Sequence, residues 1–485
     1  MRATAKYWTV FTAGAALYAL GAMPASASVE VSSKPTQNMS CTSGVCTPTA
    51  KKAVLNVADL TTMLANGDTT VKTNVTAQDV EIDAALSWGS AHKLILDSYH
   101  SIAFNRPVKA SNGGGLTVTT NDGADGGNYR FFGKGAVRFG NLNSSLIINS
   151  AQFTLVNGIR QIEKLAHTTQ GAQYVALARN IDASGYADGT LPFGFAAFEG
   201  LGNAISNLTI HSSADNANVG LFDKVTGTIR DLNILNADIA GTGEGAGVGG
   251  IAGVVLQGSI LYCSVTGRIS ADGSLATAGG LAGANEGAII GAHSDASVSL
   301  ASNGASLGGL VGWNFSEDRS QSNESIADSY ATGAVTGGDN VDIGGLVGFN
   351  RGGTISNSYS AGQVSGGMSD YIGGLAGENY GSGASIYSSY ATGAISGGSG
   401  ALVGGLIGRD DVQAGISNSY WDLDTSGISD PSQGAGNVPN DPGITGLSDA
   451  QLKSGLPSGF DKKVWKQSSD INNGYPYLID NPPPK

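Results

Sequence analysis

Glycine, aliphatic and polar positions recur through the second half of the chain with a period of about thirty residues. A phrase of two glycines, an aliphatic residue, any residue and a third glycine occurs six times, at spacings of 30, 29, 36, 29 and 31 residues, beginning at Gly249, Gly279, Gly308, Gly344, Gly373 and Gly404. A fixed period of this length predicts a solenoid in which each coil buries its apolar stripe against its neighbours. We therefore expect an all-β fold, a parallel β-helix that is right-handed by the crossover rule.

A second phrase, Ile-x-x-Ser-Tyr, follows the later glycine phrases and begins at Ile326, Ile355, Ile386 and Ile416. The segments beginning at Ile205 and Ile229 are interpreted as degenerate copies, which predicts about eight coils between residues 200 and 421. A small residue and an aliphatic residue follow most of these isoleucines at fixed distances, as at Gly362 and Val364. Each coil is therefore expected to have two β segments separated by turns.

Three columns of equivalent residues are expected in such a stack. Glycine pairs at the corners would allow positive φ and close approach of neighbouring coils. An internal ladder of side-chain amides is predicted at Asn285, Asn314, Asn350 and Asn379, with Asp410 in the fifth place. An aromatic column is predicted at Tyr330, Tyr359, Tyr390 and Tyr420, either packed within the fold or exposed as a strip that grips sugars.

The first part of the chain has weaker patterns. Residues 28–53 are rich in Ser, Thr and Lys and are predicted to be a flexible leader. Short alternating runs over residues 54–199 predict an N-terminal β-helical region with strands such as Lys93–Asp97. Two short helices are expected there, one stopping at Gly67 and one over Ile159–Ala166.

The C-terminal part is expected to close the array. Residues 422–442 are predicted to be a loop, because Gly, Ser, Pro and Asp dominate them. Residues 443–485 are predicted to be a cap with one short helix after Ser448, since Ser448 and Gln451 have the spacing of a capping box. Such a cap would cover the unpaired β edge at the end of a solenoid.

Residues 1–27 have the features of a secretory signal peptide. Arg2 and Lys6 precede an apolar stretch from Tyr7 to Met23, and Ala25-Ser26-Ala27 provides a cleavage site. We therefore expect a secreted or surface-located bacterial protein, cleaved near Ala27. No later stretch reaches 18 apolar residues, which predicts no membrane span in the mature chain.

Charge and cysteine content narrow the range of partners. The formal net charge of −13 argues against nucleic acid and anionic lipid as partners. Cys41 and Cys46 bracket a short loop where a disulfide is plausible in an oxidising compartment, and their bonding is left open. Cys263 is expected to be a buried, inert thiol.

Candidate catalytic residues are sparse. The five histidines, His92, His100, His167, His211 and His293, form no H-E-x-x-H metal motif, and no nucleophile elbow or phosphate-binding loop occurs. The acidic positions Asp410, Asp411, Asp422 and Asp424 are assigned to turns, where Asp is a preferred residue. We expect no catalytic, metal-binding or cofactor-binding residues, and no enzyme activity.

The phrases Gly344–Gly348 and Ile355–Tyr359 resemble the GLUG repeat of bacterial surface proteins, whose hosts include filamentous-haemagglutinin-like adhesins and non-catalytic regions of immunoglobulin A metallopeptidases. The stretches Phe153–Asn157, Ile181–Ser184 and Phe198–Ile210 resemble the segment before such repeats in haemagglutinin-like adhesins. The region around Ala85–Trp88 and Leu94–Leu96 resembles the β-helical part of the same family. The resemblance implies an exported adhesin or interaction protein that contacts a host-cell surface, an extracellular glycan or another surface polymer. Residues 28–53 are short for the secretion domain of such adhesins, so a secretion partner is left open. The alternatives are a polysaccharide-active β-helix lyase or hydrolase, and a structural matrix or surface-layer component.

Overall fold

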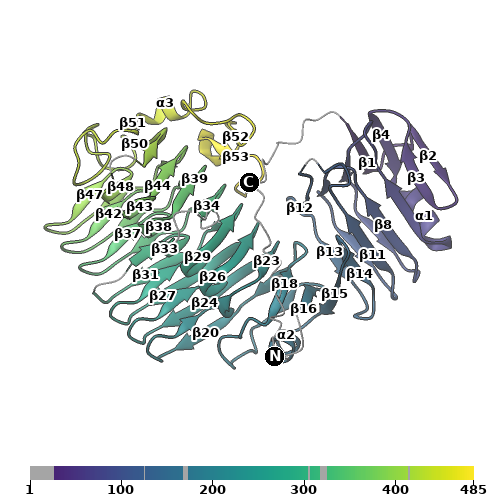
Figure 1. The fold of residues 1–485 in the computed structure, drawn as a ribbon, viewed down its shortest axis with the longest axis horizontal. Helices are drawn as coiled ribbons and strands as arrows, with labels where there is room; N and C mark the ends of the chain where they lie inside the picture. Colours follow the sequence, from purple (N-terminus) through teal and green to yellow (C-terminus); the bar gives the residue numbers. More distant parts are fainter. Residues whose placement is uncertain are drawn as a thin grey trace, which may run out of the picture.

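Parallel strands stack coil upon coil along most of the chain (Figure 1). The computed structural model describes residues 27–124, 126–167, 173–303, 306–316, 325–412 and 415–484, so the expected signal peptide lies outside it except for Ala27. The all-β fold class is confirmed: the described residues form long stacks of parallel strands with three short α-helices. The right-handed winding stays a prediction.

The N-terminal stack occupies residues 28–148 and has three strand faces. Its strands are β4 (Lys52–Asn56), β1 (Ser28–Ser32), β6 (Asp79–Ile82), β9 (Ile102–Phe104) and β12 (Tyr129–Phe131) on the first face; β7 (Leu86–Trp88), β10 (Val108–Ala110) and β13 (Val137–Phe139) on the second; and β3 (Val45–Pro48), β5 (Thr69–Lys72), β8 (Lys93–Asp97), β11 (Gly115–Thr119) and β14 (Leu146–Ile148) on the third. The strand expected at Lys93–Asp97 is therefore confirmed.

The prediction of a flexible leader at residues 28–53 is wrong. Strand β1 pairs in parallel with β4 and β6, and Val29 and Val31 are fully buried. Strands β2 (Met39–Thr42) and β3 form a hairpin that is bridged by the Cys41–Cys46 disulfide. The polar composition concealed a strand alternation, in which the inward-pointing Val29 and Val31 alternate with Ser28 and Glu30, and this short pattern is enough to begin a stack.

Both helices expected in the N-terminal region are present. Helix α1 (Val57–Asn66) begins where the Asn56 side chain accepts hydrogen bonds from backbone N–H groups, and it ends at Gly67. Helix α2 (Ile159–Ala166) buries Ile159 and Ile162 against the repeat core. Each helix is amphipathic and covers part of a stack with its apolar face.

A hairpin joins the two stacks. Strand β14 pairs antiparallel with β15 (Ala151–Val156), which is followed by the parallel strands β16 (Gln173–Leu177) and β18 (Phe195–Glu199). In β16, Ala176 packs in the N-terminal core, whereas Val175 and Leu177 pack in the repeat core. One sheet therefore separates the two cores.

A typical coil of the repeat array has five short strands, where two were expected. The coil of residues 342–365 comprises β37 (Asp342–Gly344), β38 (Val347–Arg351), β39 (Thr354–Ser356), β40 (Tyr359–Ser360) and β41 (Val364–Ser365). The two expected β segments are each broken by corners of the coil into shorter strands. The same five segments occur in the coils on either side, as β32 (Ser306–Gly308), β33 (Val311–Phe315), β34 (Ser325–Ala327), β35 (Tyr330–Ala331) and β36 (Val335–Thr336), and as β42 (Tyr371–Gly373), β43 (Ala376–Tyr380), β44 (Ser385–Tyr387), β45 (Tyr390–Ala391) and β46 (Ile395–Ser396).

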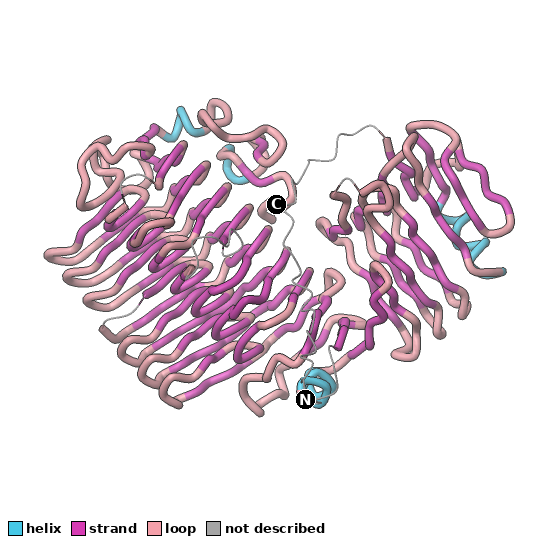
Figure 2. Tube along the Cα trace, in the orientation of Figure 1, coloured by secondary structure: helices cyan, strands magenta, loops and turns pink. Residues whose placement is uncertain are grey.

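The other coils of the array vary this plan. The earlier coils join some segments into longer strands, including β24 (Asn233–Gly241), β26 (Ala252–Leu261), β27 (Ser264–Ala271) and β29 (Ala282–Ile290). The last glycine phrase lies in a coil formed by β47 (Leu402–Gly404), β48 (Ile407–Asp410), β49 (Ile416–Ser417) and β50 (Ser419–Asp422). Figure 2 shows the coils as successive layers of strand and loop.

The predicted register is confirmed for the glycine phrases. Gly249, Gly279, Gly308, Gly344, Gly373 and Gly404 are consecutive partners in one column. The alignment of Ile205 with Ile229 is wrong, because Ile205 pairs with Ile234 and the partner of Ile229 is Phe198. The segment beginning at Ile205 therefore lies on the face of β24, and not on the face that contains Ile229.

The glycine pairs serve close approach and not positive φ. A Cβ atom on Gly345 would lie 2.1 Å from the carbonyl oxygen of Gly374 in the next coil, and Gly345 has no positive φ. Positive φ occurs at another corner, two residues after the first residue of the second phrase, in seven successive coils: Asp231, Tyr262, Gly291, Asp328, Asn357, Ser388 and Asn418. Several of these residues are Asn or Asp, which tolerate the left-handed region.

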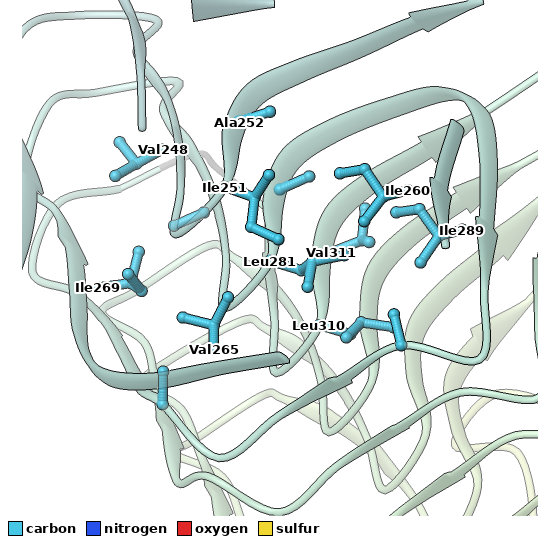
Figure 3. Close-up of a cluster of buried hydrophobic side chains, with 14 of the residues drawn as sticks. Val248, Ile251, Ala252, Ile260, Val265, Ile269, Leu281, Ile289, Leu310 and Val311 are labelled. Atoms are coloured by element: carbon cyan, nitrogen blue, oxygen red, sulfur yellow. The ribbon is translucent and has the colours of Figure 1, made fainter. Parts of the chain in front are cut away.

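Aliphatic side chains from every face fill the interior of the array. Figure 3 shows Val248, Ile251, Val265, Ile269 and Ile289 directed into the interior from different parts of the coils. At one inner corner the predicted amide ladder is confirmed: the Nδ2 atom of each asparagine donates to the Oδ1 atom of the residue in the next coil at 2.8 Å, along Asn285, Asn314, Asn350, Asn379 and Asp410. All five residues have 0% exposure, so the ladder satisfies buried polar groups that would otherwise destabilise the core.

The C-terminal segment both extends the stack and covers its side. Strand β51 (Ile444–Leu447) pairs in parallel with β50 and covers its free edge, as a cap would. Helix α3 (Asp449–Leu452) begins with the predicted capping box of Ser448 and Gln451. Strands β52 (Trp465–Lys466) and β53 (Tyr477–Leu478) then lie along the flank of the array, which the cap prediction did not include (Figure 1).

We expect the Gly345→Ala variant to unfold at a lower temperature than the wild type. The added Cβ atom would meet the Gly374 carbonyl oxygen at 2.1 Å, and backbone in a stacked coil cannot move away freely, so a loss of about 1–3 kcal/mol is expected. Thermal unfolding followed by circular dichroism measures the change. Gly455→Ala is the matched control, because a Cβ atom there has no neighbour within 4 Å. Equal destabilisation by both substitutions would contradict the role of close approach.

Candidate interaction surface

The tyrosine column is stacked as predicted, but it is not an exposed strip. The rings of Tyr330 and Tyr359 are 4.8 Å apart and those of Tyr359 and Tyr390 are 5.0 Å apart, and all three side chains are fully buried. Trp465 of the C-terminal segment packs against two of these rings, and the Tyr390 hydroxyl donates to the Pro476 carbonyl oxygen at 2.6 Å. Of the two alternatives, packing within the fold is therefore the one that the structure supports.

The acidic residues assigned to turns have structural partners. The Asp422 carboxylate is buried and accepts hydrogen bonds from the Asp424 backbone N–H at 2.8 Å and the Tyr475 hydroxyl at 2.7 Å. Asp424 in turn accepts from the Asp449 backbone N–H at 2.9 Å. Asp411 forms an ion pair with Arg409 at 2.9 Å. These carboxylates hold the C-terminal segment and the last coils in place.

The histidines are dispersed over the molecule. His100 contacts Asp79 at 2.7 Å in the N-terminal stack, whereas His293 stacks on Tyr330 and contacts Asn481 at 3.0 Å. His92 and His211 each lie beside a different aspartate, and His167 ends helix α2. Across the described ranges, no three His, Cys, Asp or Glu side chains are grouped so that they could hold a metal ion.

A hollow of about 510 Å³ lies beside helix α2. Its lining includes Arg160, Arg179, Tyr186 and a single carboxylate, that of Asp182. A glycoside-cleaving site needs a pair of carboxylates across its cleft, and this lining does not provide one.

A second set of aromatic side chains lies on the outer face of the array, on both sides of the amide ladder. Since ladder residues point inward, their neighbours in a strand point outward. Trp313 and Phe349 are consecutive partners just before the ladder residues, with ring centroids 6.0 Å apart. Just after the ladder residues, the register runs from Phe315 through Arg351 to Tyr380. We name these five residues the ladder-flanking face.

Charged residues continue the ladder-flanking face toward the C-terminal end of the array. Glu378 and Arg409 follow Phe349 in register and approach each other to 3.4 Å. Arg409 also donates to the Tyr371 hydroxyl at 3.1 Å. Burial, reinforced by the nearby Glu378 carboxylate, raises the pKa of Asp342 to about 8, so this carboxyl is mainly protonated at neutral pH. The charges at this end are thus largely balanced among themselves.

The sequence identifies this face through the residues on either side of each ladder asparagine. Trp313-Asn314-Phe315, Phe349-Asn350-Arg351 and Glu378-Asn379-Tyr380 are equivalent triplets, centred on the ladder asparagines. Once the asparagines are assigned to the interior, strand alternation places both neighbours outside. The predicted ladder therefore also predicts which residues the array presents to its surroundings.

Two segments of the chain match the GLUG motif family model, residues 244–270 and 339–365. The resemblance to GLUG repeats is confirmed for these segments, and the resemblance to haemagglutinin-like adhesins stays a prediction. A search of curated proteins found no match. Among solved structures, similarity was found to a protein from Bacteroides ovatus that is provisionally named an immunoglobulin A1 protease. The two share 20% identity over 67% of this chain and 92% of that chain, with a TM-score of 0.43.

The free cysteine of the described chain is not in a reactive environment. Cys263 is buried within the array, and its burial raises the pKa of the thiol, which disfavours the reactive thiolate. Among the described residues, no helix has the length and apolar character of a membrane span.

A buried pair of carboxyl groups ends the amide ladder. Asp410 accepts from Asn379, and Asp441 lies close to Asp410 with only 3% exposure. Burial and the neighbouring Asp410 carboxylate raise the pKa of Asp441 to about 7. The protonated form is thus favoured in the folded state, so the stability that this group contributes is full below pH 4 and is lost as the pH rises through 7.

We therefore expect the Asp441→Asn variant to be more stable than the wild type at pH 8.5, by a larger margin than at pH 5. The carboxamide is neutral at both values and removes the cost of a buried carboxylate, which is about 1–3 kcal/mol. Melting temperatures of both proteins at the two pH values measure the difference. The exposed Asp470→Asn substitution serves as the control. A wild-type stability that stays flat relative to Asp441→Asn between these values would contradict the assignment.

Proposed function

We propose that this chain is an exported, non-catalytic interaction protein of the adhesin type, which acts at a bacterial cell surface or in the extracellular medium. Export would follow cleavage of the signal peptide near Ala27. GLUG repeats are typical of extracellular or surface-associated proteins, and two segments of the array match that motif. The observation that carries the proposal is the ladder-flanking face, where outward aromatic and arginine side chains recur in register over successive coils.

Stacking gives this face its rigidity. Each outward residue is adjacent to a ladder residue whose side chain is bonded to the next coil at 2.8 Å. The contact residues are therefore held in fixed positions before any partner arrives, which lowers the entropy lost on binding. Aromatic residues and arginine are also the residue types enriched where protein surfaces bind partners.

Binding is expected to be distributed over several coils. Each coil contributes only one or two contact side chains, so a single coil supplies a small share of the affinity. Clustering of several copies on one surface then raises the apparent affinity through multivalency. This mode of action needs no catalytic group.

An adhesion assay with the mature protein, residues 28–485, tests the proposal. Protein immobilised on beads at high density should retain cells or cell-envelope material, and monomeric protein should compete weakly. Trp313→Ala should reduce retention partly, and the triple variant Trp313→Ala/Phe349→Ala/Tyr380→Ala should reduce it about tenfold or more. Tyr174→Ala is the control, because Tyr174 is 38% exposed and lies far along the chain near helix α2.

Circular dichroism and melting temperature of each variant establish that the fold is retained. Adhesion that is unchanged in the triple variant would place the contact elsewhere on the molecule. Absence of adhesion, combined with self-assembly of the mature protein into sheets or fibres, would favour a structural matrix component. Release of soluble fragments from envelope material would contradict the non-catalytic assignment.

A further inference from the structure

The ladder-flanking face is a track that runs parallel to the axis of the array over three successive coils, with Trp313, Phe315 and Phe349 half-buried. Its rings follow one another across coils: Trp313 and Phe349 are 6.0 Å apart, and Phe349 and Tyr380 are 6.2 Å apart. Tyr380 is 44% exposed, and Arg351 is exposed between the rings with its guanidinium 5.4 Å from the Phe315 ring centroid. A partner that uses the whole track must therefore be extended along the axis.

The polar side chains at the end of the track include both hydrogen-bond donors and hydrogen-bond acceptors. Arg409 contacts Glu378 at 3.4 Å, Asp411 at 2.9 Å and the Tyr371 hydroxyl at 3.1 Å, so its charge is balanced locally. The protonated Asp342 carboxyl adds a neutral group that can donate and accept. Such a set suits hydroxyl groups, which also donate and accept, better than it suits a row of like charges.

The backbone of the track is not available to a ligand. Strands β33, β38, β43 and β48 pair with one another in sequence, so their N–H and C=O groups are directed along the stack. An extended peptide that binds by strand addition needs a free edge, which this face does not offer. A polyanion would meet a chain of net charge −13 and an arginine already paired with two carboxylates.

We propose that the ladder-flanking face, with Tyr371 and Arg409 at its end, binds a neutral linear polysaccharide that lies along the solenoid axis. The rings pack against the apolar faces of successive sugar units, and the Arg409 cluster forms hydrogen bonds with hydroxyl groups. This proposal rests on the proposed function and names the class of ligand for the same surface.

Affinity electrophoresis of the mature protein provides the test. Gels contain either a neutral glucan or mannan, or an acidic polymer such as alginate or hyaluronate. We expect retardation by at least one neutral polysaccharide and none by the acidic polymers. The dissociation constant should rise about tenfold in Trp313→Ala/Phe349→Ala. Arg409→Met should weaken binding while Tyr174→Ala leaves it unchanged.

The outcomes separate the class of ligand from the function itself. Adhesion to cells that is lost after protease treatment, and is unaffected by soluble neutral polysaccharide, would overturn the polysaccharide and leave the interaction function standing, with a protein as the partner. Retardation by acidic polymers alone would overturn the neutral ligand. Retardation that is equal in wild type and Trp313→Ala/Phe349→Ala would overturn the assigned face. Release of new reducing ends would support polysaccharide recognition but contradict the non-catalytic function.

Discussion

The close approach of neighbouring coils is the constraint on which this structure depends. At the glycine corner the backbone of one coil lies against the backbone of the next, and a Cβ atom on Gly345 or Gly374 would lie within 2.5 Å of a carbonyl oxygen. The spacing allows parallel hydrogen bonding on every face of the coil and brings equivalent residues into register. Each repeated residue therefore forms a column along the stack, such as the glycine column, the amide ladder and the tyrosine column.

The amide ladder and the ladder-flanking face are two sides of the same strand alternation. Inside, each asparagine donates to the next, and the series ends on the Asp410 carboxylate. Outside, the neighbouring positions vary between aromatic and charged residues, which are half-buried at Trp313 and Phe349 and exposed at Arg351 and Tyr380. The ladder is therefore uniform from coil to coil, whereas the outward positions beside it differ.

The junction between the stacks uses another interaction, the stacking of arginine on tyrosine. Arg130 from the N-terminal stack lies 3.4 Å from the Tyr262 ring centroid, and Arg230 from the array lies 4.0 Å from that of Tyr129. The Tyr129 hydroxyl donates to Glu199, and burial raises the pKa of that carboxyl to about 8. The C-terminal segment reaches this junction too, where Arg130 donates to the Asp480 carbonyl oxygen. A buried charged cluster of this kind favours one relative placement of its parts, because any other would leave charges unpaired.

The sequence by itself determined the repeat period, the register of the glycine phrases, the amide ladder, the tyrosine column and the positions of helices α1 and α2. These follow from local periodicity and from the requirement that equivalent residues stack. It did not reveal the strand β1, since two buried valines in a polar stretch are too short a pattern to read alone. Only the tertiary structure decided that the tyrosine column is covered and that, beside the ladder, Trp313 and Phe349 are half-buried while Tyr380 is exposed. The cover comes from the C-terminal segment, whose contact with Arg130 joins residues 350 positions apart. No periodic pattern encodes such a contact, because it depends on how the chain returns through space after the last coil is complete.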